Sequence, residues 1–170
     1  MVPQPLPASP VHFPQLLALN QAAVHFLSPL DAGRLASLHR EAACLTVLLE
    51  GDTVLAFLLA FAPGAAYDSP NYRWFDSRYR DFLYVDRVVV TESRRHAGLG
   101  SVLYRDLFAR ARASGVARVV CEYDLEPANP ASAAFHHRLG FSEVGRQRVA
   151  AGSKLVSLQA CALAVCVREA

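Results

Sequence analysis

The chain has 170 residues and a mass of 18.5 kDa; 53% of its residues are hydrophobic and 19% are charged. This hydrophobic fraction is enough for a sizeable core and excludes a generally disordered chain. The formal net charge of +2 is smaller than the basic excess usual in proteins that hold nucleic acid through phosphate contacts, so no nucleic-acid partner is expected.

No segment has the pattern of a signal peptide or a membrane span. The longest apolar run, 54–62, is far shorter than the roughly 20 residues that a spanning helix needs. The cysteines lack the CxxC spacing and indicate buried thiols in a reducing compartment: Cys44, Cys121, Cys161 and Cys166. We therefore expect a cytoplasmic protein with no membrane partner. The histidines show no zinc-ligand spacing, so no metal is expected either.

In the first half of the chain, residues 1–10 are predicted to form a loose tail, followed by a single domain over residues 11–170. Helical spacing covers 18–27 and 31–43, with Asp31 as a plausible N-cap. Two β-like runs, 45–50 and 53–61, flank Gly51-Asp52 and predict a hairpin. The next stretch, 63–81, is too polar for a core segment and too aromatic for an inert linker.

The second half alternates strands and helices. The predicted elements are a strand at 82–90, a loop at 91–100, a helix at 99–114, a strand at 117–125, a helix from Asn129-Pro130 to Leu139-Gly140, and a hairpin of 141–150 and 155–167. The central β-α-β unit predicts a parallel pair of strands with a right-handed crossover. The flanking hairpins are expected to extend this pair into a mixed sheet.

The loop Arg94-Arg95-His96-Ala97-Gly98-Leu99-Gly100-Ser101 lies between a predicted strand and a predicted helix. Its glycines allow the backbone to approach a ligand closely, and the N–H groups of a helix start attract anions. This pattern predicts a phosphate or diphosphate site, although such a loop can also be only a tight turn. A P-loop is excluded because Ser101 and Val102 follow Gly100, and Leu103 replaces the third glycine of the dinucleotide fingerprint.

Two motifs carry a family resemblance. Residues 95–100 resemble the Arg/Gln-x-x-Gly-x-Gly/Ala signature of the GNAT superfamily of CoA-dependent N-acetyltransferases, and residues 129–141 resemble its second motif, an Asn that opens a helix closing with Leu-Gly-Phe. The element order is similar from about Leu16 to Val167. The resemblance implies an α/β fold with a mixed, mostly antiparallel central sheet, a parallel splayed pair in its middle, and flanking helices. It departs from the family near 11–13, where the usual first strand is short or missing.

The resemblance also implies acetyl-CoA as co-substrate. The diphosphate would be held by the residues Arg95, His96, Ala97, Gly98, Leu99, Gly100 and Ser101. The pantetheine arm would add to the strand edge at Val88, Val89 and Val90, and an N–H of Val88 or Val89 would polarise the thioester carbonyl. Asn129, Ser132 and His136 complete the implied cofactor site, although Asn129 can equally be a plain N-cap.

Three residues are candidates for proton transfer. His136 stands where the family often has a Tyr that protonates the leaving thiolate, and an imidazolium can do the same. The alternative for His136 is a histidine that only packs beside CoA, with Tyr104 and Tyr123 in reserve as donors. Asp86 and Glu122 are carboxylates in otherwise apolar strands, which suggests either a base for the amine or an ion pair with an arginine. Glu122 is the preferred base because it lies nearer Asn129.

The implied reaction is direct attack of a primary amine on the thioester in a ternary complex. The aromatic and acidic segment 67–76 is a candidate wall for the acceptor site, or else a dimer contact or lid. A small-molecule or peptide amine is the expected acceptor, and the chain is expected to be a monomer or homodimer. The alternative function is a CoA-binding or acyl-CoA-binding regulatory module with the same fold and little turnover. A third option is transfer of a longer acyl group or transfer to an oxygen acceptor.

Overall fold

The structure is a computed structural model that describes residues 3–163. Contacts divide this part of the chain into two compact units, one comprising residues 3–61 and 85–107 and the other residues 62–84 and 108–163. The single domain expected over residues 11–170 stays a prediction. None of the helices found between residues 3 and 163 is long and apolar enough to cross a membrane.

The strands form a seven-stranded mixed sheet in the order β1-β2-β3-β4-β5-β7-β6. Its parallel pair is β4 (Leu83–Val90) with β5 (Arg118–Glu126), in which Leu83 pairs with Val119 and Tyr84 with Val120. This confirms the parallel pair expected from the central β-α-β unit. The crossover helix is α4 (Leu99–Ala113), close to its predicted bounds.

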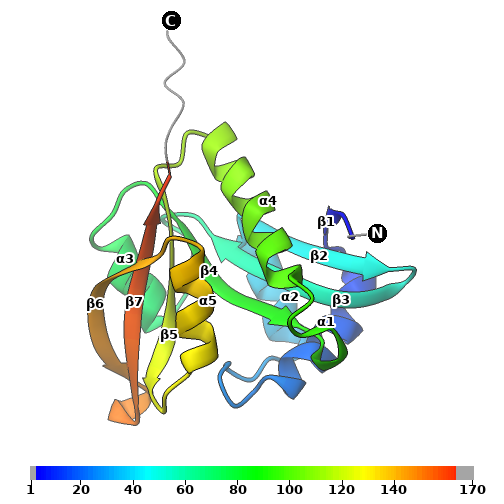
Figure 1. The fold of residues 1–170 in the computed structure, drawn as a ribbon, viewed down its shortest axis with the longest axis horizontal. Helices are drawn as coiled ribbons and strands as arrows, with labels where there is room; N and C mark the ends of the chain where they lie inside the picture. The colour runs from blue at the N-terminus through cyan, green and yellow to red at the C-terminus, as the bar shows by residue number, and fades with distance from the viewer. Residues whose placement is uncertain (1–2, 164–170) are drawn as a thin grey trace, which may run out of the picture. The chain divides into compact units, whose positions relative to one another are not determined.

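The first unit contains β1 (Pro5–Pro7), α1 (Phe13–Ala22), α2 (Ala32–Glu41), β2 (Cys44–Glu50) and β3 (Thr53–Phe61). Helix α1 packs against α2 and β3, and Figure 1 shows both helices behind β2 and β3. The predicted hairpin is confirmed, since Glu50 pairs with Thr53 across a turn in which Gly51 has a φ of 58°. Asp31 caps α2 as expected, because its Oδ1 accepts a hydrogen bond from the Arg34 N–H at 2.7 Å.

Two expectations for the N-terminal region are wrong. Residues 5–7 are not a loose tail, because Pro5 pairs with Leu48 and Pro7 with Thr46 as an antiparallel edge strand. Prolines are compatible with an edge strand, where one side of the backbone needs no partner. Helix α1 also begins and ends earlier than the predicted 18–27, since Pro14 in its first turn favours the helix start there. Residues 1–2 lie outside the described part of the chain.

The second unit contains α3 (Pro70–Asp76), β5, α5 (Pro130–Arg138), β6 (Ser142–Val149) and β7 (Lys154–Ala162). The predicted C-terminal hairpin is confirmed, and β7 lies between β5 and β6. Figure 1 shows β6 as the outermost strand of this unit. The predicted extension of β7 to Val167, together with Cys166, lies outside the described residues. No disulfide joins the described cysteines, Cys44, Cys121 and Cys161.

Helix α3 is the largest element that the sequence analysis missed. The stretch 63–81 looks irregular, but Ser69-Pro70 is a helix-start signal: Ser69 Oγ accepts from the Tyr72 N–H at 3.4 Å, and Pro70 occupies the first turn. Tyr72 and Phe75 are buried against Tyr84 on β4, with ring centroids 5.6 and 5.9 Å away. The aromatic residues of the segment therefore form core as well as surface.

The two faces of β5 are covered by different helices. Glu122 contacts Asn71 of α3, whereas Tyr123 stacks with His136 of α5. Successive side chains of a strand point to opposite faces, so α3 and α5 lie on opposite faces of β5. Figure 1 shows α5 in front of β5 and α3 behind it. The two preferred proton-transfer candidates, Glu122 and His136, are thus on different faces of the same strand.

Candidate active site

The loop after β4 includes left-handed backbone conformations, as its glycine content suggests. It begins with a short 3-10 turn, Glu92–Arg94, and continues through His96 and Gly98, whose φ values are 68° and 79°. Both values lie in the left-handed region, where glycine is tolerated at little cost and other residues are uncommon. Three N–H groups of the loop are used internally. Arg94 donates to the Thr91 carbonyl at 3.0 Å, and Arg95 donates to the Glu92 carbonyl and Ala97 to the Arg94 carbonyl, each at 3.2 Å.

The start of α4 follows directly. Its first backbone bond runs from the Val102 N–H to the Gly98 carbonyl at 3.1 Å. The N–H groups of Leu99, Gly100 and Ser101 precede that bond, at the positive end of the helix dipole. An anion is stabilised at such a position. Among the loop residues expected to bind diphosphate, the N–H groups from Gly98 to Ser101 therefore fit the role better than those of Arg95 and Ala97.

The arginines at this loop already contact carboxylates. Nη2 of Arg94 lies 2.7 and 2.6 Å from the two carboxylate oxygens of Glu50, and Arg95 lies 3.7 Å from Glu92. All four side chains are largely exposed, so these ion pairs are screened by water and contribute little to stability. An incoming phosphate can compete for either guanidinium.

The end of β4 carries the valines expected beside the pantetheine arm. Val89 is 5% exposed, while Val88 and Val90 are half-buried. The Thr91 N–H donates to the Leu55 carbonyl at 2.8 Å, which fixes this end of β4 against β3. The contact of Val88, Val89 and Val90 with a cofactor stays a prediction.

Asp86 lies in a buried ion pair. Its Oδ2 is 2.5 Å from Nε of Arg87, and the two side chains are only 6% and 4% exposed. Arg87 also donates from Nη1 to Oδ1 of Asn20 at 2.6 Å. The Asp86 carboxylate is thus already paired with a buried guanidinium. The ion-pair interpretation therefore fits Asp86 better than the role of a base.

Glu122 has a different environment. Its Oε1 accepts from Nδ2 of Asn71 at 2.8 Å and from the Tyr84 hydroxyl at 3.0 Å. Asn71 is 8% exposed and Tyr84 is fully buried, while Glu122 itself is half-buried. These two partners are neutral, unlike the arginine at Asp86. Glu122 is the candidate carboxylate whose described contacts suit proton transfer.

His136 lies under the surface of α5, 4% exposed. Its Nδ1 is 2.8 Å from the Ser132 carbonyl oxygen and 3.2 Å from Ser132 Oγ. A carbonyl oxygen only accepts, so Nδ1 carries hydrogen and the lone pair of the neutral ring lies on Nε2. Burial lowers the pKa of His136 below its usual 6.5, although the bond to Ser132 opposes this in part. His136 is therefore neutral at neutral pH.

Asn129 and Ser132 hold the helix that carries this histidine. Asn129 Oδ1 accepts from the Ser132 N–H at 3.1 Å, which confirms Asn129 as the N-cap of α5. At the other end, Gly140 has a φ of 88°, as expected for the residue after a helix. The cofactor contacts predicted for Asn129 and Ser132 stay predictions.

A chain of polar side chains runs across β7 beneath His136. The His136 ring is nearly parallel to that of Tyr123, with an interplanar angle of 19° and 6.0 Å between centroids. Nε2 of Gln159 lies 3.4 Å from the Tyr123 hydroxyl and 2.7 Å from Ser157 Oγ, which donates to Glu143 at 2.5 Å. The bond from Ser157 lowers the pKa of Glu143. Of the two reserve proton donors, Tyr123 is thus next to His136, while Tyr104 is fully buried in α4.

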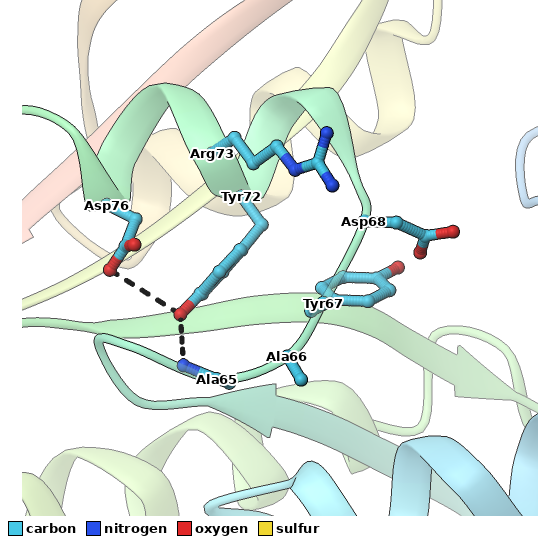
Figure 2. A pocket seen from close by; sticks show the side chains of 7 residues that line it. All are labelled: Ala65, Ala66, Tyr67, Asp68, Tyr72, Arg73 and Asp76. Carbon is cyan, nitrogen blue, oxygen red and sulfur yellow. Dashed lines mark hydrogen bonds between the residues drawn. The ribbon is translucent and has the colours of Figure 1, made fainter.

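The segment before β4 forms a pocket of about 400 Å³ in the second unit. Figure 2 shows its walls: Ala65, Ala66, Tyr67, Asp68, Tyr72, Arg73 and Asp76. The Tyr72 hydroxyl donates to the Ala62 carbonyl and accepts from the Ala65 N–H, each at 2.8 Å, so this ring is a fixed wall. Burial, followed by the nearby Asp76 carboxylate, raises the pKa of Tyr72. The pocket combines aromatic faces with two carboxylates and one guanidinium, that of Arg73, so its lining has a net negative charge that suits a cationic group.

Comparison with known families identifies the family of this chain. Residues 14–141, most of the chain, match the acetyltransferase (GNAT) family. The chain belongs to the GNAT family. The matched region includes the loop at the start of α4 and the whole of α5, so both motifs of the sequence analysis lie within it. No curated protein matches the sequence significantly.

Solved structures confirm the GNAT fold. The ribosomal-protein-S18-alanine N-acetyltransferase of Escherichia coli has a TM-score of 0.74 at 17% identity, covering 100% of this chain and 99% of that one. Ard1 of Thermoplasma volcanium has a TM-score of 0.77 at 15% identity, covering 96% and 99%. An aminoglycoside 6'-N-acetyltransferase complexed with coenzyme A has a TM-score of 0.67 at 16% identity, covering 95% of each chain. At these identities the likeness concerns the fold.

Proposed function

We propose that this GNAT protein transfers the acetyl group of acetyl-CoA to a primary amine by direct attack. The observation that carries the proposal is the loop from Gly98 to Ser101, where a left-handed glycine leads into the N-terminus of α4. Family membership supplies the reaction class, and this loop supplies a site for the diphosphate.

The start of α4 and the end of β4, both in the first unit, are the proposed binding site for acetyl-CoA. The N–H groups at the start of α4 bind the diphosphate, and the backbone of Val88, Val89 and Val90 binds the pantetheine arm by strand addition. Acetyl-CoA supplies the activated thioester when bound. An N–H of Val88 or Val89 polarises the thioester carbonyl where negative charge grows. A reducing, cytoplasmic setting is part of the proposal, in keeping with the absence of a disulfide among the described Cys44, Cys121 and Cys161.

Glu122 acts as the base, directly or through one water. In the net reaction a C–N bond forms and a C–S bond breaks, while the nitrogen loses a proton and the sulfur gains one. Asn71 and Tyr84 donate to Glu122 Oε1, which holds the carboxylate in place. Positioned proton transfer of this kind typically contributes about 10²–10⁴-fold to a rate.

His136 returns a proton to the sulfur. Because the ring is neutral, with its hydrogen on Nδ1, its Nε2 must first accept a proton from water before it donates one to the sulfur. The proton that Glu122 takes from the amine returns to water, because Glu122 and His136 lie on opposite faces of β5. Burial then favours rapid release of that proton, since it disfavours the imidazolium. The sequence suggests a simple proton donor; the tautomer and the lowered pKa support a relay that accepts and then donates.

The acceptor is a small molecule or peptide that presents a primary amine. The pocket of Figure 2 supports a cationic acceptor, because Tyr67 and Tyr72 offer ring faces and its two carboxylates outnumber the single guanidinium of Arg73. Tyr67 also packs 6.4 Å from the ring of Tyr84, which donates to Glu122. The pocket and the proposed base are therefore connected through one aromatic ring.

An amine-panel assay tests the function. We expect release of free CoA thiol, and an acetylated product by mass spectrometry, when acetyl-CoA is mixed with peptides bearing free N-termini, polyamines, amino acids or aminoglycosides. Matched acceptors whose amine is already acetylated serve as controls. Tight binding of acetyl-CoA without thiol release from any amine would contradict turnover and favour the CoA-binding regulatory module.

Replacement of His136 tests the relay. His136→Phe keeps a planar ring against Tyr123 and removes both nitrogens, so we expect turnover to fall about 10- to 100-fold. The dissociation constant of acetyl-CoA should change less, within about threefold, because the diphosphate site is elsewhere in the chain. Steady-state kinetics and calorimetry measure the two quantities. Equal turnover in the variant would remove His136 from the mechanism.

His136→Phe should also change how the free energy of unfolding depends on pH. Below about pH 6.5 the unfolded chain takes up a proton at His136, whereas the folded chain resists it because the folded pKa is lowered. The free energy of unfolding should therefore decrease as the pH falls below 6.5, and His136→Phe should make this decrease smaller. Urea unfolding between pH 5 and pH 8 measures it.

A further inference from the structure

The contacts of Glu122 continue beyond its two donors. Nε2 of Gln147 on β6 donates to Oδ1 of Asn71 at 2.7 Å, and Nδ2 of Asn71 donates to Glu122 Oε1 at 2.8 Å. The Tyr84 hydroxyl donates to the same oxygen. The four side chains come from α3, β4, β5 and β6, and Asn71 bridges Gln147 and Glu122.

The direction of this chain is fixed by chemistry. A carboxylate only accepts, so Asn71 must turn its NH₂ group towards Glu122 and its carbonyl oxygen towards Gln147. Gln147 in turn must present its own NH₂ group to that oxygen. Asn71 is therefore held in one amide orientation, and an aspartate of the same shape would place an oxygen against the carboxylate.

Close packing brings α3 to this place. A Cβ atom at Gly145 of β6 would lie only 2.7 Å from Cζ2 of Trp74, so the absence of a side chain there makes room for the Trp74 ring. The Ser69 cap and the buried rings of Tyr72 and Phe75 fix the helix from its other side. Asn71, 8% exposed, lies within this fixed turn.

We propose that Asn71 is a positioning residue for acetyl transfer: it holds the Glu122 carboxylate in one orientation for the acceptor amine, and Gln147 sets the direction of its amide. This inference rests on the proposed function, in which Glu122 is the base. Asn71 itself touches neither co-substrate nor acceptor in this role. A group held in its productive orientation before substrate arrives reacts with a smaller entropic cost.

The described contacts of Glu122 in its own unit come from one titratable group and one neutral amide. Tyr84 donates to it from β4, and Asp124, two residues along the same face of β5, is paired with Lys154 at 2.9 Å. The cross-strand neighbour on β7 is the apolar Leu158, and the described contacts from α3 and β6 come from Asn71 and Gln147. A new charge at residue 71 would lie within hydrogen-bond distance of Glu122 Oε1, and a new charge at residue 147 would lie one side chain further away.

The isosteric variant Asn71→Asp tests the inference. Hydrogen bonds to a carboxylate favour its charged form and a neighbouring like charge disfavours it, so the variant should raise the midpoint of the Glu122 titration by about one pH unit or more. Carbon-13 NMR of the Glu122 carboxyl measures this without any need for activity. The acid limb of kcat/KM should move to higher pH by the same amount, with the acetyl-CoA KM within about threefold of wild type.

Two further variants keep the test decisive. Gln147 is at a half-buried strand position, and Gln147→Glu replaces its NH₂ donor with an acceptor. This variant should also raise the midpoint of the Glu122 titration, but by less than Asn71→Asp, because residue 147 contacts Asn71 and not Glu122. Ser69→Ala removes the cap of α3 but adds no charge and leaves both amides in place, so it should lower stability by an amount typical of a lost N-cap and move the Glu122 titration less than either charged variant does. A Glu122 midpoint unchanged in both Asn71→Asp and Gln147→Glu would overturn the proposal.

The outcomes also separate this inference from the proposed function. Loss of turnover in Glu122→Gln, with no titration shift in Asn71→Asp, would contradict the positioning role alone. A titration shift in Asn71→Asp, with full turnover in Glu122→Gln, would contradict Glu122 as base and with it the role of Asn71 in catalysis.

Discussion

Glu122→Gln should lower kcat by about 100-fold or more while leaving acetyl-CoA binding within about threefold of wild type. Glutamine has the shape of glutamate, and its Oε1 can still accept from Asn71 and Tyr84. It cannot take up a proton at neutral pH, so only proton removal from the acceptor amine is lost. Initial rates over pH 6–9 and calorimetry with acetyl-CoA give the two values.

A matched control is available on the same strand. Glu126 is an exposed carboxylate of β5 that pairs with Arg148 at 3.0 Å, so Glu126→Gln should retain wild-type turnover. Full activity in Glu122→Gln would exclude Glu122 as the base. The next carboxylate to test would then be Asp124, which lies on the same face of β5.

Gly98→Val should weaken acetyl-CoA binding by about 10- to 100-fold, because a β-branched residue is strongly disfavoured at a φ of 79°. A Cβ atom at this position would meet no other atom within 4 Å, so the effect comes from the backbone and not from a clash. The loop must change conformation, and the N–H groups that follow it lose their common direction. Calorimetry with acetyl-CoA measures the loss.

Gly98→Asn provides the control for this prediction. Asparagine adopts the left-handed conformation more readily than other residues with a side chain, so this variant should bind acetyl-CoA more tightly than Gly98→Val. Circular dichroism should show the same fold for both. If both variants bind acetyl-CoA as the wild type does, the diphosphate is not held by this loop.

Local signals were sufficient for the framework of the fold. Gly51-Asp52, Asn129-Pro130 and Gly140 each determine a turn, a helix start or a helix end through the backbone conformations that they favour. The loop around Gly98 was recognisable for the same reason. The order of elements from β2 to β7, and with it the family resemblance, therefore followed from residues close together in sequence.

Elements whose stability depends on distant partners were missed. The edge strand β1 exists because β2 pairs with Pro5–Pro7, and no periodicity in a proline-rich segment indicates that pairing. Helix α3 has a short local start signal at Ser69-Pro70, but its aromatic residues pack against Phe82, just before β4, and against Tyr84 on β4, which local sequence does not indicate.

The sequence by itself determined the strand, loop and helix that suit a coenzyme diphosphate, because glycine conformations and helix starts are properties of the local backbone. Only the tertiary structure distinguished the surroundings of the two candidate carboxylates. Asp86 and Glu122 are similar in sequence, each an acid in an apolar strand, but Arg87 pairs with the first and Asn71 and Tyr84 donate to the second. The chemical behaviour of a carboxylate depends on which charges and dipoles surround it, and folding brings these from distant parts of the chain.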